Sequence, residues 1–293
     1  MNAPLTVGER SRRWRYGALF IALLSGAPAH ALTTLIAAGD VALCAQNAEN
    51  SMAAQTAKLV PADAQVLVLG DTVYPIISDH TFDTCYLPTW GRFLERTYAV
   101  PGNHDIVDHT ADIFLRHFNR PAGRLTYFKA PLGEDAWLFG LDSNLKSSAL
   151  EQQTAWLAKE LAALPADHRC LIAMWHHATI STGLHRGDGD GLKPAWRLLN
   201  QAKADVVLSG HEHFYESFDP RGDDALPAAE GIREFIVGTG GAQMIDVGLG
   251  QGQRRLYRKF GVLKLVLQHH HVDYQFLTID GQHLDAGQFN CRR

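Results

Sequence analysis

Side chains able to bind metal recur at five places along the chain, each directly after a short apolar run. Carboxylate, amide and phenolate oxygens and imidazole nitrogens are common protein ligands of transition metals. Each motif alone is weak, because Gly-Asp is a common turn pair and a lone buried histidine is usually a core residue. In chain order, however, the motifs GD, GDxxY, GNHD, HH and GHxH are a strong joint signal. Their candidate residues are Asp40, Asp71, Tyr74, Asn103, His104, Asp105, His176, His211 and His213.

The apolar runs before these motifs alternate with helix-like segments, which is typical of strands joined by helical crossovers. This rhythm predicts an α/β fold with a largely parallel, buried sheet. In open α/β sheets, ligands bind in the crevice at the carboxyl ends of the strands. We therefore expect the five motifs to meet at one place. The strands are predicted within residues 33–40, 64–71, 97–105, 170–177 and 205–213, with a final hairpin within 261–279.

The first 31 residues have the features of a secretory signal peptide. Four arginines precede the apolar segment 17–26, and Ala29 and Ala31 are the small residues that signal peptidase reads. The apolar core is about half of the ~20 residues needed to span a bilayer, so no membrane span is expected. The pair Arg12-Arg13 leaves Sec and twin-arginine export both open. We predict an exported protein, periplasmic or extracellular, with residues 32–293 as a single domain.

Charge and cysteine content restrict the partners and the compartment. Removal of four arginines and one glutamate with residues 1–31 changes the formal net charge from −4 to −7. So acidic a chain argues against general nucleic-acid binding, and no such partner is expected. An even number of cysteines in an exported protein favours disulfides. Three pairings are possible among Cys44, Cys85, Cys170 and Cys291, and the sequence does not choose between them.

Taken in order and with their spacing, the motifs resemble those of the calcineurin-like metallophosphoesterases, and within them the purple acid phosphatases. The resemblance extends from about residue 38 to residue 291. It is strongest to exported bacterial members, which share a strand ending in WHH, the segment TGG at residues 239–241 and a final hairpin. The resemblance implies an α/β/β/α sandwich with two mixed central sheets.

The resemblance also implies a ligand set for two metal ions. Asp40, Asp71, Tyr74 and His213 would hold the first metal, and Asp71 would bridge to a second one held by Asn103, His176 and His211. Many family members begin with Asp-x-His, but here Ala42 stands at the histidine position. Tyr74 compensates for this loss, since purple acid phosphatases place a phenolate there. A phenolate favours Fe(III), with Fe(II), Zn(II) or Mn(II) expected in the second site.

Three further residues are expected on the substrate side. By resemblance, His104 lies beside the substrate phosphate, where it donates a proton or stabilises the transition state. Asp105 is expected to orient His104, and His185 is expected as a second substrate-side histidine. His177 is expected to bind metal less readily than His176. The sequences GDGD at 187–190 and HHH at 269–271 are predicted as a flexible surface loop and a solvated turn.

The sequence is compatible with three functions. The preferred one is an exported phosphomonoesterase that hydrolyses small phosphate esters with a metal-activated hydroxide. The first alternative is a phosphodiesterase acting on nucleotides or lipid headgroups. The second is a non-catalytic metal-binding or scaffold domain, which would be expected to lack ligands or His104. The sequence does not indicate the oligomeric state.

Overall fold

The computed structural model describes residues 1, 32–44, 47–118, 125–133, 136–166, 168–245 and 255–293. The proposed signal peptide, apart from Met1, lies outside these residues. From Leu32 onward the described residues belong to one compact unit. Among the described helices, none is both long and apolar enough to cross a membrane.

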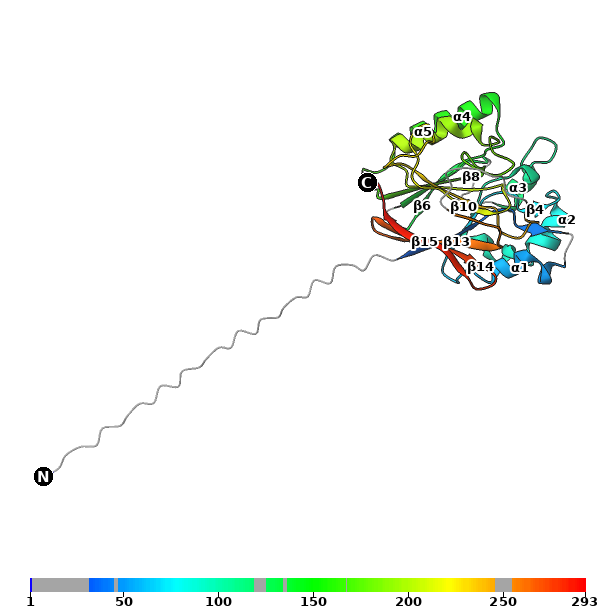
Figure 1. The fold of residues 1–293 in the computed structure, drawn as a ribbon, viewed down its shortest axis with the longest axis horizontal. Helices are drawn as coiled ribbons and strands as arrows, with labels where there is room; N and C mark the ends of the chain where they lie inside the picture. Colours follow the sequence, from blue (N-terminus) through cyan, green and yellow to red (C-terminus); the bar gives the residue numbers. More distant parts are fainter. Residues whose placement is uncertain (2–31, 45–46, 119–124, 134–135, 167, 246–254) are drawn as a thin grey trace. The chain divides into compact units, whose positions relative to one another are not determined.

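Two large mixed sheets form the centre of this unit (Figure 1). The first has the order β15-β14-β13-β1-β3-β5, and the second has the order β12-β10-β11-β9-β8-β7-β6. The strands of the first sheet are β1 (Thr33–Ala38), β3 (Gln65–Val68), β5 (Thr97–Ala99), β13 (Gly261–Gln268), β14 (His271–Thr278) and β15 (His283–Asn290). Those of the second are β6 (Phe128–Leu132), β7 (Ala136–Gly140), β8 (Cys170–His177), β9 (Val206–Gly210), β10 (Tyr215–Ser217), β11 (Arg233–Val237) and β12 (Arg255–Tyr257). A small parallel pair joins β2 (Ala42–Leu43) to β4 (Val73–Tyr74).

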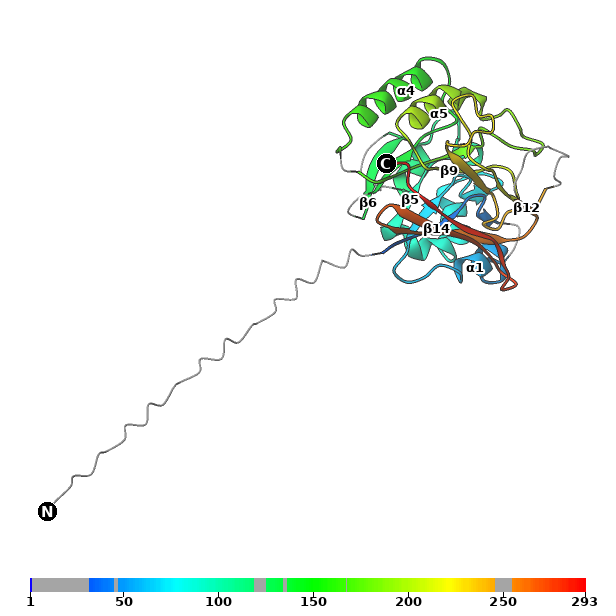
Figure 2. The same ribbon diagram turned by 60° about the vertical axis from the view of Figure 1, so that its left-hand side comes forward.

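Helices cover the outer faces of the two sheets. The pair α4 (Ser147–Ala162) and α5 (Lys193–Gln201) lies on the second sheet, where Leu157 and Trp196 belong to the same buried apolar cluster as Trp175 of β8. Figure 2 shows this pair on the side of the unit opposite to α1 (Met52–Ala57). The shorter helices are α2 (Asp79–Thr81), α3 (Asp112–His117), the π-helix Phe82–Tyr86 and the 3₁₀ segments Ala48–Asn50, Trp90–Arg96, Asn103–Asp105 and Asp190–Leu192. The expected α/β/β/α sandwich is thus confirmed.

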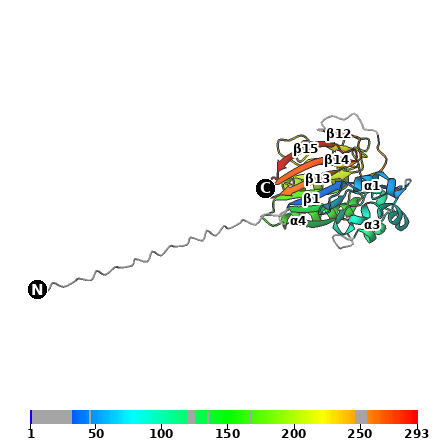
Figure 3. The same ribbon diagram turned by 90° about the horizontal axis from the view of Figure 1, so that it is seen from below.

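The sheets are less parallel than the rhythm of the sequence predicts. Strands β1, β3 and β5 run parallel, as do β7, β8, β9 and β11. The closing strands pair antiparallel (Figure 3). Strand β13 lies beside β1, and tight connections join β13 to β14 and β14 to β15. His269 and His270 form the turn of this hairpin, as predicted, whereas His271 is not in the turn but is the first residue of β14.

The central strands are buried on both faces, which explains their continuous apolar sequences. Leu35, Ile36, Val66 and Leu67 have no exposed surface. Within each sheet the parallel strands end at one edge, so the residues after β1, β3 and β5 lie together, as do those at the ends of β8 and β9. The core therefore fixes the strand ends that carry the five motifs.

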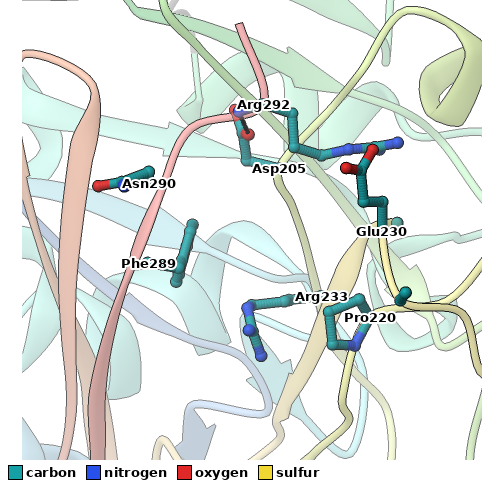
Figure 4. Close-up of a pocket in the computed structure, with 9 residues that line it drawn as sticks. Asp205, Pro220, Glu230, Arg233, Phe289, Asn290 and Arg292 are labelled. Carbon is teal, nitrogen blue, oxygen red and sulfur yellow. Dashed lines mark hydrogen bonds between the residues drawn. The ribbon is translucent and has the colours of Figure 1, made fainter.

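The disulfides tie loops and the carboxyl terminus to this core. Cys44 pairs with Cys85, and Cys170 at the start of β8 pairs with Cys291. Near the second disulfide, between the starts of β9 and β11 and the end of β15, lies a pocket of about 280 Å³. Figure 4 shows its labelled residues, which include Asp205, Arg233, Phe289 and Arg292. This pocket lies at the ends of β9 and β11 that are opposite to the five motifs.

Candidate metal centre

Four side chains from three separate segments form a first group of ligand atoms. The hydroxyl of Tyr74 lies 2.6 Å from Asp40 Oδ1, 2.6 Å from Asp71 Oδ2 and 2.9 Å from His213 Nε2. His213 Nε2 is also 3.1 Å from Asp40 Oδ1. These four residues are the ones expected to hold the first metal.

A second group of ligand atoms lies beside the first. His176 Nε2 is 3.2 Å from each of three atoms: Asp71 Oδ2, Asn103 Oδ1 and His211 Nδ1. Asp71 Oδ2 therefore belongs to both groups, which is the arrangement that a bridging carboxylate requires. The seven predicted ligands lie together in the structure, Tyr74 in β4 and the others at or after the ends of β1, β3, β5, β8 and β9.

The orientation of the Asp71 carboxylate is set by the loop after β5. The backbone N–H of His104 donates to Asp71 Oδ1 at 2.8 Å, which leaves Oδ2 facing the two ligand groups. Gly102 approaches so closely that a Cβ atom there would overlap the Asp71 carboxylate. The glycine of GNHD is thus required by the close contact between this loop and the end of β3.

Three of the ligands have a strained backbone. Asp40, Asp71 and His211 adopt positive φ angles of 59°, 51° and 69°. Non-glycine residues in this region cost roughly 1–3 kcal/mol each, and such strain is frequent at functional sites. Each of the three residues ends an apolar strand and turns its side chain toward the other ligands. The sequence contains no signal for this conformation beyond the preceding glycines.

The buried carboxylates change the acidity of the groups around them. Burial and the charges of Asp40 and Asp71 raise the pKa of Tyr74 well above its ordinary value. Burial would lower the pKa of His176, but Asp71 raises it to about 9. Asp40 likewise overcomes burial at His213 and raises its pKa to about 9. The two aspartates therefore favour positive charge at this place.

The donor set fits two metal cations. Cations held by the same oxygen and nitrogen atoms would replace the protons that the carboxylates favour on Tyr74 and the histidines. The first group is rich in anionic oxygen and suits a hard ion such as Fe(III). The second contains two imidazoles, one amide oxygen and the shared carboxylate, and suits a divalent ion.

His104 borders the first ligand group. Its ring lies 4.4 Å from the Tyr74 ring, and its Nε2 atom is 4.0 Å from Asp71 Oδ2. Its Nδ1 atom lies 2.5 Å from the Pro75 carbonyl oxygen. Because a carbonyl only accepts, Nδ1 carries the proton and Nε2 is the nitrogen that remains for a substrate. About a third of the side chain is exposed.

Asp105 has a different position from the one expected. Its carboxylate accepts hydrogen bonds from the backbone N–H of Thr72 at 3.0 Å, from the Thr72 hydroxyl and from the backbone N–H of Gly102 at 2.9 Å. Asp105 thus orients the backbone of the loop and not the His104 ring, which is held by Pro75. Burial and the charge of Asp71 raise the pKa of Asp105 to about 7.

His185 lies near the second ligand group, with its ring 4.5 Å from that of His211. Asp188, which the sequence places in a surface loop, accepts from His211 Nε2 at 3.0 Å and lies 3.6 Å from His185 Nδ1. A carboxylate on the far nitrogen of a ligating histidine fixes the ring and its tautomer. The contact of Asp188 with His211 was not predicted, because nothing in the local sequence GDGD distinguishes it from a surface loop.

His177 lies beside the second ligand group. Its ring lies 4.4 Å from the ring of His211, and its Nδ1 atom lies 2.7 Å from the Ser143 hydroxyl. Burial and the neighbouring His176 and His211 lower the pKa of His177 to about 2. His177 is therefore a neutral neighbour of the second ligand group.

Comparison with known proteins identifies the family of the chain. The family profile of the calcineurin-like phosphoesterases matches residues 34–215. The Fe(3+)-Zn(2+) purple acid phosphatase 12 of Arabidopsis thaliana is 26% identical over 210 residues, which cover 63% of this chain and 44% of that protein. The chain thus spans less than half of this curated relative.

Two solved structures show a similar fold. The purple acid phosphatase PPD1 of yellow lupin (Lupinus luteus) superposes with a TM-score of 0.69 at 16% identity, covering 89% of this chain and 54% of PPD1. GAP50, described as the anchor in the inner membrane complex of Plasmodium, also gives 0.69, at 12% identity, covering 89% and 90% of the two chains. At such low identity these likenesses establish the fold alone. The match of the family profile to more than half of the sequence shows that the chain belongs to the calcineurin-like phosphoesterase family.

Proposed function

We propose that this protein is an exported, dinuclear-metal phosphomonoesterase of the purple acid phosphatase type. The observation that carries the proposal is the position of Asp71 Oδ2, which is shared by two groups of ligand atoms, one of them containing the phenol of Tyr74. The chain has all seven ligands that the resemblance to purple acid phosphatases implies, together with His104. A non-catalytic scaffold of the same fold would be expected to have lost some of them.

The ligands have separate tasks in this proposal. Asp40, Tyr74 and His213 would hold Fe(III), and Asn103, His176 and His211 would hold Fe(II), Zn(II) or Mn(II), with Asp71 between them. When bound, the metal pair supplies positive charge that offsets the charge of the phosphate and lowers the pKa of water. His104 Nε2 faces the substrate side and, when protonated, donates to the oxygen of the leaving group. A small phosphate monoester is the proposed substrate.

Export is proposed on the basis of the amino-terminal sequence and the cysteines. Disulfides persist in oxidising compartments, and both pairs of this chain have partners that are far apart in sequence, by 41 and 121 residues. When the full chain is produced in a bacterial host with a periplasm, we expect periplasmic protein that begins at Leu32 and has two disulfides. Intact-mass measurement before and after reduction checks this. Protein that retains Met1 and carries four free thiols would contradict it.

Asp71→Asn tests the shared ligand. Asparagine presents one neutral oxygen in place of a carboxylate with two, so it is a poor bridge. We expect elemental analysis to show a fall from two metal ions per chain to one or none. Asp285→Asn is the matched control, because Asp285 is a buried carboxylate that bonds Tyr215 and Ser217 instead of the candidate ligands. Two tightly bound ions in Asp71→Asn would refute the bridge.

Tyr74→Phe tests the nature of the first site. A phenolate bound to Fe(III) gives a charge-transfer band in the visible range, and phenylalanine has no oxygen to form it. We expect the oxidised protein to be coloured and the variant to lack the band while retaining its fold by circular dichroism. A colourless protein that holds two metals would exclude a tyrosinate iron site and favour a zinc- or manganese-dependent phosphoesterase.

His104→Ala tests the substrate side. Loss of a general acid lowers turnover by about 10²–10⁴-fold, and the loss should be greatest for esters with poor leaving groups. Metal content should not change, because the His104 side chain is outside the proposed ligand set. His271→Ala on the exposed hairpin is the control and should keep full activity. Steady-state rates on alkyl and nitrophenyl phosphates measure the effect. If His104→Ala hydrolyses alkyl phosphates as fast as the unchanged protein does, His104 has no part in the reaction.

A further inference from the structure

The segment from Thr179 to His185 connects β8 to the substrate side of the second ligand group without forming a helix or a strand. Backbone N–H groups outside regular structure still need acceptors. Here three glutamates supply them. The bonds run from Thr179 and Ile180 to Glu234 at 3.1 and 3.0 Å, from Thr182 to Glu216 at 3.1 Å, and from His185 to Glu212 at 3.1 Å.

Two of these glutamates lie on one face of the second sheet. Glu216 of β10 is opposite Ile236 of β11, and Phe218 donates its N–H to the carbonyl of Glu234 at 3.0 Å. Alternate residues of a strand share a face, so two carboxylates and two apolar side chains face the same way. A small apolar cluster seats the segment there. It consists of Ala178, Phe218 and Ile236, with Ile180 packed against them.

These carboxylates are costly to bury. Glu216 and Glu234 have no exposed surface, and burial raises the pKa of Glu216 to about 7 and that of Glu234 to about 8. Well-packed apolar residues in place of buried charged groups often leave a protein equally or more stable. Stability alone therefore does not explain three glutamates at this place, whereas the need for acceptors along the segment does.

The third glutamate joins the segment to the metal ligands. Glu212 lies between His211 and His213 in sequence, and its Oε1 accepts from the Ser181 hydroxyl at 2.7 Å as well as from the N–H of His185. Gly183 passes so close that a Cβ atom there would overlap the Glu212 carboxylate. The segment is thus held against the loop 211–213, called the ligand loop below, with no room for a larger residue at position 183.

We propose that Glu212, Glu216 and Glu234 are positioning residues that hold the segment 179–185 and so place His185 beside the second metal site. The inference rests on the proposed phosphoesterase function. In this proposal, the position of His185 depends on one carboxylate from β10, one from β11 and one from the ligand loop. None of the three glutamates touches the substrate in this proposal.

Glutamine substitutions test the anchors with little change in shape. Glu234 accepts three hydrogen bonds, the third from the Ser209 hydroxyl at 3.2 Å, and glutamine offers only one oxygen. In Glu216→Gln and Glu234→Gln we expect faster hydrogen exchange of residues 179–185. We also expect kcat/KM on a phosphate monoester to fall by about 10–100-fold, as for other residues that orient a metal site, with metal content retained.

A double-substitution cycle separates positioning from a general loss of structure. If the glutamates act through His185, Glu234→Gln should change kcat/KM by less than about twofold when His185→Ala is already present. Asp205→Asn is the matched control, since Asp205 is a buried carboxylate that accepts two backbone N–H groups, those of Leu171 and Arg292, at the opposite end of β9. It should lower the unfolding temperature without changing kcat/KM or exchange in 179–185.

A second variant covers the case in which a glutamine substitution fails to fold. Gly183→Ala removes no carboxylate but forces the segment away from Glu212, and should reproduce both the exchange and the kinetic effect. The proposal is overturned by unchanged exchange in these variants, by equal losses of kcat/KM with and without His185, or by full activity of His185→Ala. Hydrogen exchange needs no substrate, so a protein that hydrolyses no phosphate ester would reject the proposed function while the exchange result still decides the anchoring.

Discussion

The site is organised around one oxygen atom, Asp71 Oδ2. It can serve two groups of ligands because the other oxygen of the same carboxylate is already bound by the backbone N–H of His104. That bond needs the loop after β5 to lie directly on the end of β3, which in turn needs a glycine at position 102. The apposition of the two sheets then brings His176 of β8 within 3.2 Å of the same oxygen. Each ligand position thus follows from packing in the core, where β1 and β3 are buried on both faces.

This convergence has an electrostatic and a conformational cost, and both are local. Asp40 and Asp71 are completely or almost completely buried, and their neighbours compensate for the charge, as the raised pKa values of His176 and His213 show. Asp40, Asp71 and His211 also adopt positive φ angles. Roughly 1–3 kcal/mol of strain for each residue persists only where the surrounding structure fixes the conformation. The strands before these residues provide that structure, since their apolar side chains are packed on both sides.

The strands, their buried character and the candidate ligands could be predicted from sequence because they depend on short-range order: an apolar run, a glycine and a polar residue. The antiparallel closing strands were harder, since nothing local says that β13 pairs with β1. The pairing of the cysteines, the true partners of Asp105 and the contact of Asp188 with His211 could not be predicted. Each depends on a contact between residues at least 23 positions apart, which leaves no periodic pattern in the chain.

The two histidines proposed for the substrate side lie in segments whose backbone is held by buried carboxylates. Most of the candidate ligands lie on or next to strand ends, where sheet hydrogen bonds fix the backbone, and Asn103 lies in the 3₁₀ segment that also contains His104. His104 and His185 lie beyond the reach of the sheets, in loops whose N–H groups would otherwise lack acceptors. In both cases buried carboxylates take the place of a neighbouring strand: Asp105 for the loop of His104, and the glutamates Glu212, Glu216 and Glu234 for the segment of His185. A carboxylate can accept from two or three donors, so it can hold several N–H groups of an irregular loop at once. Asn103 lies directly beside His104, and Glu212 lies between His211 and His213, so these anchors also connect the proposed substrate side to the candidate metal ligands.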